Sequence, residues 1–176
     1  MDRRTQFEAL YRAHRDPLAA FVYRRAPPAS ADDVVAEVFL TAWRRLPEIP
    51  EDELAWLLRI ARGVLANRRR GDTRRRVLRG RLAAEAVSAE RSRQDSSESE
   101  SPVLRALARL SEHDQEVLLL VAWDGLDRAR AARVLGISPG AFAVRLHRAR
   151  RKFEAALTAL SDADTRSQQR SSAMEI

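Results

Sequence analysis

Cysteine is absent from this chain of 176 residues. Without thiols the protein can form neither a disulfide nor a thiolate metal site, and it has no cysteine nucleophile. The only histidines, His14, His113 and His147, are scattered and match no metal-ligand spacing. We therefore expect no metal and no cofactor. The lack of disulfides also agrees with a cytoplasmic location.

Long hydrophobic runs are absent too. No stretch approaches the roughly 18 consecutive apolar residues of a transmembrane helix. The segment Met1–Gln6 leads into a charged amphipathic stretch without the apolar core of a signal peptide. We therefore expect a protein that is not inserted in a membrane.

The signatures of an enzyme are missing as well. There is no glycine-rich phosphate loop and no nucleophile elbow. Asp32 and Asp33 are adjacent on a predicted helix and point in different directions, which is poor geometry for paired acid–base chemistry. These absences predict a protein that is not an enzyme and has no small-molecule substrate.

Lysine is nearly absent, since Lys152 is the only one, so arginine carries almost all of the positive charge. The formal net charge is +7. Arginine offers planar, bidentate donors to phosphate and to guanine. A coding bias toward arginine explains the excess equally well, but it does not explain where the arginines cluster. An acidic polymer is the partner that this charge favours.

Glycine is scarce, and no segment alternates apolar and polar residues as a strand would. Most segments carry apolar residues at helical spacing, which predicts an all-α fold. Between residues 85 and 102 serines mix with acidic residues, which predicts a flexible acidic linker. It joins two small helical domains, residues 1–84 and 103–160. The polar tail, residues 161–176, is expected to be disordered.

Three helices are expected in the first domain. The first covers about residues 4–25, with Pro17 as a kink or break inside it. Ser30 and Asp33 form a capping-box pattern, which places the start of the second helix at Ser30. The third helix covers about residues 52–70 and runs into an arginine-rich stretch.

Two stretches of the first domain differ in charge. Residues 62–81 are dense in arginine, with Asp72 as their only acidic residue, and this density suits a phosphate backbone. The second helix begins with Asp32 and Asp33, which compensate the helix dipole. Glu37 lies too far along that helix for the same explanation, so a protein partner is its functional interpretation.

The segment from Asp127 to Arg151 has the pattern of helix, turn and helix. Gly136 closes one helix and Ser138 caps the next. In a helix-turn-helix the second helix enters the major groove of DNA. Arg145 and Arg148 are three residues apart and share a face, so they are the leading candidates for DNA contact. A basic surface helix on an ordinary bundle is the alternative interpretation.

Three stretches together resemble the sigma-70 family of RNA polymerase sigma factors, specifically its extracytoplasmic-function (ECF) group. Residues 32–43 look like the helix that binds the clamp coiled coil of the polymerase's largest subunit. Residues 56–62 look like the next helix, which faces the downstream promoter element. Residues 125–151 look like the domain that reads the upstream element. The resemblance covers roughly residues 5–78 and 103–158, in family order and spacing.

This resemblance implies an alternative sigma factor that binds RNA polymerase core and directs promoter recognition, DNA melting and transcription initiation. It also implies an anti-sigma factor as a partner. The residues implied for core binding are Asp32, Asp33, Ala36, Glu37 and Leu40. The loop implied to capture a flipped base contains Pro47, Glu48, Ile49 and Pro50. The residues implied for the downstream element and its phosphates are Arg59, Arg62, Asn67, Arg68, Arg69 and Arg70. Those implied for the upstream element are Ser138, Gly140, Ala141, Arg145, Arg148 and Arg151.

The sequence departs from the family pattern at several positions. In the first domain the departures are Ala36, Gly63 and Asn67. In the recognition helix, Ala143 and Val144 replace a basic residue and a serine. The latter changes predict weaker contact with the upstream element, or contact shifted toward Arg145 and Arg148.

A stand-alone helix-turn-helix regulator is the alternative function. Such a regulator binds its operator without polymerase, commonly as a dimer on a palindrome. A sigma factor needs core polymerase to bind promoter DNA, so this dependence separates the two functions.

Overall fold

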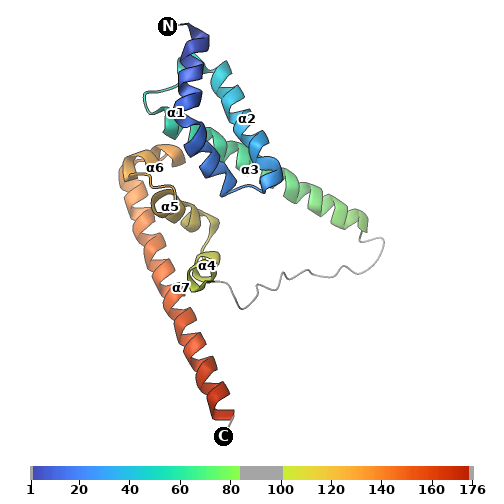
Figure 1. Cartoon of the computed structure of the whole chain (residues 1–176). Coiled ribbons are helices and arrows are strands. Elements are labelled where there is room, and N and C mark those ends of the chain that lie inside the picture. The colour runs from blue at the N-terminus through green and yellow to red at the C-terminus, as the bar shows by residue number, and fades with distance from the viewer. Residues whose placement is uncertain (1, 84–100, 175–176) are drawn as a thin grey trace. The chain divides into compact units, whose positions relative to one another are not determined.

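The computed structural model describes residues 2–83 and 101–174, with side chains described for residues 2–74 and 101–162 (Figure 1). In these ranges all regular elements are helices, which confirms the all-α prediction. They are α1 (Arg3–Tyr23), α2 (Pro28–Arg44), the 3₁₀ turn η1 (Leu46–Glu48), α3 (Glu53–Ala83), α4 (Pro102–Ala108), α5 (Glu112–Ala122), α6 (Arg128–Leu135) and α7 (Pro139–Met174).

The helices group into two compact units, so the predicted division into two helical parts is confirmed. The first unit holds α1, α2 and α3. The second holds α4, α5, most of α6 and α7. The predicted acidic linker, residues 85–102, lies almost wholly outside the described residues, and its flexibility stays a prediction.

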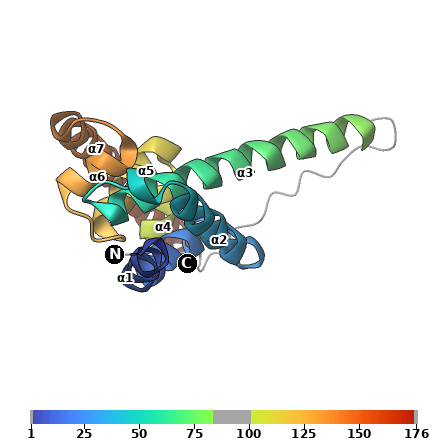
Figure 2. The ribbon, with the colours of Figure 1, turned by 90° about the horizontal axis from the view of Figure 1, so that it is seen from above.

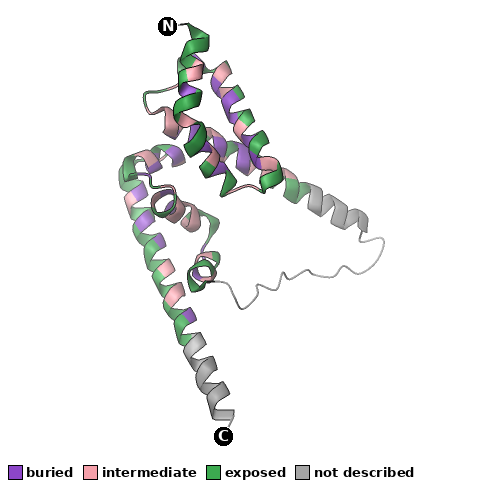
Figure 3. Cartoon of the chain, viewed as in Figure 1, coloured by how far each residue is buried: buried purple, intermediate pink, exposed green. Residues whose placement is uncertain are grey.

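The core of the first unit is formed where α1, α2 and α3 pack against one another. Buried apolar positions recur at helical spacing along each helix (Figure 3). Each side chain of this size contributes roughly 1.5–3 kcal/mol on full burial. Among the largest fully buried side chains are Leu18, Phe21, Val22, Val34, Val38 and Leu57.

An aromatic cluster joins α1 to α2. The ring of Phe7 meets that of Trp43 edge-on, with centroids 5.2 Å apart. Tyr11 lies 4.6 Å from Phe39 on the same side of the two helices. Such pairs contribute about 0.5–1.5 kcal/mol beyond the area they bury, so the cluster fixes α2 in place.

Two boundaries in the first unit differ from expectation. Helix α1 continues unbroken past Pro17. Helix α2 begins at Pro28 rather than at Ser30. The hydroxyl of Ser30 donates to the carbonyl of Pro27 at 3.1 Å and caps no backbone amide, so the predicted capping box is wrong. Proline is preorganised for the first helical turn, and this preference placed the start two residues earlier.

Helix α3 is longer than the sequence analysis expected. It begins where Asp52 accepts a hydrogen bond from the backbone N–H of Ala55 at 3.2 Å. It then continues through the arginine-rich stretch to Ala83. Figure 2 shows α3 as one rod without a break. The stretch contains good helix formers and no proline. Gly71 costs only about 1 kcal/mol relative to alanine inside a helix, which is too little to end α3 near residue 70.

In the second unit α7 packs against both α4 and α5. Leu120, Phe142 and Leu160 are fully buried in its core. Helix α7 reaches Met174, whereas the sequence predicted a disordered tail from residue 161. No glycine or proline follows Gly140, so no residue in the tail interrupts the helix.

Candidate DNA- and protein-binding surfaces

The turn between α6 and α7 is fixed by local hydrogen bonds. Gly136 has a φ of +67°, and the backbone N–H of Ile137 donates to the carbonyl of Ala132 at 3.0 Å. This is a Schellman ending, which needs a residue in the left-handed region and therefore favours glycine. Ser138 then caps α7 by accepting from the backbone N–H of Ala141 at 3.2 Å. The predicted helix–turn–helix is present with these caps.

The predicted upstream-element residues all lie on the exposed side of α7. Phe142, Leu146 and Ala149 face the core of the unit and are buried. The six candidates are exposed: Ser138, Gly140, Ala141, Arg145, Arg148 and Arg151. A helix face with small residues in its first turn and arginines behind it suits close approach to DNA.

The basic residues of α7 differ in what they contact. Lys152 donates to Asp114 of α5 at 2.6 Å, and this bond, with a second from Ser111, holds the pKa of Asp114 below its usual value. Among the described residues, Arg145, Arg148 and Arg151 form no ion pair. Lys152 therefore ties α7 to α5, while these arginines point their charge outward.

The predicted downstream-element residues follow α3. Arg59, Asn67, Arg69 and Arg70 are exposed, and Arg62 and Arg68 are partly buried. Arg68 reaches α2, where it lies 3.0 Å from Glu37 and 4.0 Å from Asp33. It thus joins the basic helix to the acidic one, which the sequence analysis did not predict because the partners are far apart in the chain.

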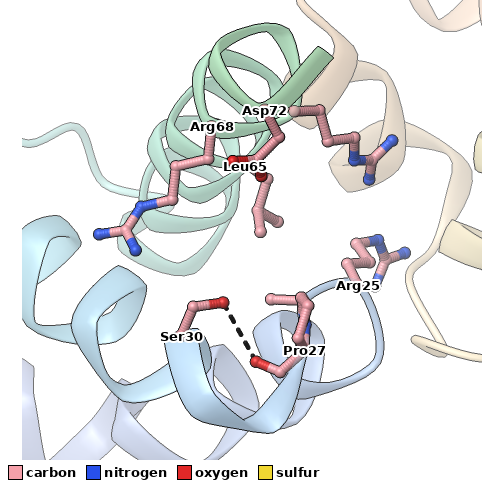
Figure 4. A pocket seen from close by; sticks show the side chains of 8 residues that line it. Arg25, Pro27, Ser30, Leu65, Arg68 and Asp72 are labelled. Atoms are coloured by element: carbon pink, nitrogen blue, oxygen red, sulfur yellow. Dashed lines mark hydrogen bonds between the residues drawn. The ribbon is translucent and has the colours of Figure 1, made fainter. Parts of the chain in front are cut away.

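A pocket of about 320 Å³ lies between α3 and the turn that joins α1 to α2 (Figure 4). Leu65 and Pro27 give it apolar walls. Arg68 and Arg25 lie on opposite sides of it in the close-up view. The remaining lining residues are Ala26, Ser30, Arg69 and Asp72. Three arginines and one aspartate line the pocket, but the charge of Arg68 is already paired with the carboxylates of α2.

The predicted core-binding residues form one exposed face of α2. Val34, Val38, Phe39 and Ala42 turn inward and are buried. Leu40 is half exposed and lies one helical turn from Glu37. All five candidates are exposed: Asp32, Asp33, Ala36, Glu37 and Leu40. An exposed leucine bordered by acidic residues suits a protein surface of complementary charge.

The predicted flipped-base loop follows α2 directly. Leu46 is buried and anchors it, while Arg45 pairs with Glu48 at 2.6 Å. Ile49 is half-buried, and the other three candidates, Pro47, Glu48 and Pro50, are exposed. The loop is therefore held at its start and presents its tip to solvent.

The described residues contain no cluster of histidine or acidic side chains suited to a metal ion. None of the helices in the described ranges is long and apolar enough to cross a membrane. One feature of α7 was not predicted from the sequence, which gave no reason to distinguish Ala143 from Val144. Ala143 is half-buried, whereas Val144 is 52% exposed.

A helix-turn-helix in one unit and an arginine-lined helix in the other define a DNA-binding protein. Comparison with known families narrows this class. Residues 10–75 match the family described as Sigma-70 region 2, and residues 101–153 match Sigma-70, region 4. The chain belongs to the sigma-70 family, in its ECF group, and is a transcription initiation factor rather than an enzyme.

Named relatives support this assignment. The ECF RNA polymerase sigma factor BldN of Streptomyces coelicolor is 34% identical over 150 residues, which cover 81% of this chain and 57% of BldN. RNA polymerase sigma factor CnrH of Cupriavidus metallidurans is 32% identical over 151 residues, 79% of this chain and 77% of CnrH.

Solved structures of sigma factors resemble the structure of this chain. The structure of CnrH in complex with the cytosolic domain of CnrY is 31% identical and has a TM-score of 0.56, covering 90% of this chain and 88% of CnrH. The sigma factor RpoE of Bartonella quintana, solved with the anti-sigma factor NepR, is 22% identical with a TM-score of 0.54 over 88% and 96% of the two chains. It supports the fold.

Proposed function

We propose that this chain is an alternative sigma factor that brings RNA polymerase core to a distinct set of promoters in the cytoplasm. The observation that carries the proposal is that three surfaces of different chemistry are all exposed. They are the acidic face of α2, the arginine-lined face of α3 and the small and basic face of α7. A stand-alone regulator would need the last of these but has no use for the first.

The α2 face is proposed to bind the clamp coiled coil of the polymerase's largest subunit. Asp32, Asp33 and Glu37 supply negative charge, and Leu40 supplies an apolar anchor. Charge complementarity speeds association and sets orientation, while an apolar contact in the centre holds the complex.

The α3 face and the preceding loop are proposed to open the downstream element. Arg59, Asn67, Arg69 and Arg70 are exposed where phosphates would approach. The loop from Pro47 to Pro50 would hold a base flipped out of the non-template strand. Extruding a base costs a few kcal/mol, which the loop and the basic surface must offset.

Helix α7 is proposed to enter the major groove at the upstream element. Ser138 and Gly140 stand at its N-terminus, where backbone amides favour a phosphate. Arg145, Arg148 and Arg151 follow on the exposed side. Phosphate contacts would set affinity, and contacts with guanine would set specificity.

An anti-sigma factor is the third proposed partner. CnrH, which is similar to this chain along most of its length, was solved bound to the cytosolic domain of CnrY. A protein that covers the exposed α2 face would block polymerase and leave the chain inactive. An exposed leucine among acidic residues is a suitable target for such a protein.

Transcription from purified components tests the proposal. Core polymerase and this chain are mixed with a library of genomic promoter fragments, and run-off transcripts are sequenced. We expect transcripts that depend on both proteins and share two sequence elements. Transcripts from core alone give the background. Specific DNA binding by the chain alone, with no effect on transcription, would favour the stand-alone regulator instead.

A further inference from the structure

Val144 lies at the centre of the solvent-facing side of α7. Successive residues of an α-helix are rotated by about 100°, so the buried positions Phe142, Leu146 and Ala149 define one side of α7. On this geometry Val144 points almost opposite to the middle of that buried side. Its side chain is 52% exposed, which agrees with that direction.

The neighbours of Val144 on this face are small or basic. Ala141 precedes it by one helical turn, and Arg148 and Arg151 follow at one and two turns. These neighbours are exposed too. The neighbours on the N-terminal side of Val144, Gly140 and Ala141, are small and leave it accessible to a groove that receives the first two turns of α7.

The chemistry of this position differs from that of the arginines. A valine cannot accept or donate a hydrogen bond, so it cannot read the polar edge of a base or bind a phosphate. The major groove offers an apolar group at thymine alone, the methyl at C5. Two γ-methyl groups on a stiff β-branched side chain match that target.

We propose that Val144 is a specificity-determining residue that contacts a thymine methyl group in the upstream element. The inference rests on the proposed function, because it requires α7 to enter the major groove. If the inference is correct, valine in place of a polar residue changes which base is preferred at this position. The preference is for thymine over cytosine or uracil, and the effect is not only weaker binding.

The test uses holoenzyme assembled from core polymerase and the full chain. Bound sequences are first selected from promoters with a randomised upstream element. Each thymine of the selected element is then replaced by uracil, which removes only the methyl group. Burial of one methyl group predicts that a single position loses about fourfold in affinity.

Substitutions then assign that loss to Val144. In V144S, which removes both γ-methyl groups, we expect equal affinity for the thymine and uracil promoters. The nearly isosteric V144T keeps one γ-methyl group and should retain part of the preference. The matched control is V103S on α4, because Val103 is also 52% exposed. V103S should keep the fourfold preference. R145A should weaken both promoters alike and also keep it.

Three results would overturn the inference: a selected element without thymine, equal binding of all uracil-substituted promoters by the unaltered chain, or a fourfold preference that survives in V144S. Failure of the proposed function looks different, since the holoenzyme would then select no sequence at all. Because Val144 is exposed, we expect its variants to fold normally, so misfolding would not explain a changed promoter preference. The thermal unfolding temperature of each variant checks this.

Discussion

Single side chains on α7 divide into those that hold the unit together and those that face outward. Lys152 reaches Asp114, and the buried Phe142, Leu146 and Ala149 form the packed side. Arg148 lies on the other side, with no ion pair to a described residue. A charge in this position contributes little to folding stability, so its removal should lower the affinity for DNA and leave the stability of the unit unchanged.

Replacing Arg148 with alanine should weaken promoter binding by the holoenzyme and reduce its dependence on salt. Each phosphate contact that is lost lowers the slope of log affinity against log salt by about one. Titrations at several salt concentrations measure the slope. Arg150 is the matched control, because it is exposed on the same helix but outside the predicted set. An unchanged slope in R148A, or an equal loss in R150A, would exclude a phosphate role for Arg148.

The lowered pKa of Asp114 predicts that the stability of the second unit depends on pH. Hydrogen bonds from Lys152 and Ser111 lower its pKa in the folded chain, so the ionised carboxyl stabilises the second unit. This stabilisation is present above the ordinary aspartate pKa of about 3.9 and is lost as the pH falls through the lower folded-state value. D114N should therefore be less stable than the unaltered chain at neutral pH and nearly equal to it in strong acid. Urea unfolding across this range measures the difference; a gap that persists in acid would contradict it.

At the scale of elements, much of the helical pattern could be predicted from local chemistry. The cap at Ser138 was predicted from a serine placed at the start of the second helix of the helix–turn–helix, and the structure has it. The start of α2 could not be predicted, because proline and serine compete for it. Contacts between helices were also beyond prediction, as with Arg68 and Glu37, since helical periodicity says which face is buried but not what it meets.

The exposed face of helix α2 can be tested by a substitution at Leu40. L40D should reduce binding of core polymerase at least tenfold, because it places a charge where an apolar anchor would be buried at an interface. Leu40 is 50% exposed in the free chain, so the variant should fold normally. L104D on α4 is the control, since Leu104 is 46% exposed. Equal affinity of L40D and the unaltered chain for core would remove α2 from the proposed interface.

At the scale of the whole molecule, each of the two units has its own core, so a substitution in one core should destabilise that unit alone. Leu120 is fully buried in the second unit and Val38 in the first. L120A should cost about 2–5 kcal/mol in the unfolding free energy of the second unit, and V38A should act on the first. Hydrogen exchange of backbone amides measures the stability of each unit separately. Loss of protection in α1–α3 caused by L120A would show that the units unfold together.

The ion pairs of Arg68 have a consequence for the order of assembly. In the free chain this guanidinium is occupied by Glu37 and Asp33, two of the residues proposed to dock on polymerase. A surface ion pair between a partly buried arginine and exposed carboxylates is worth about 1 kcal/mol, so a competing partner can exchange it readily. When polymerase takes up the carboxylates, one more arginine becomes available to a phosphate. Capture by the enzyme would then prime the chain for the promoter, and the two binding events would reinforce each other.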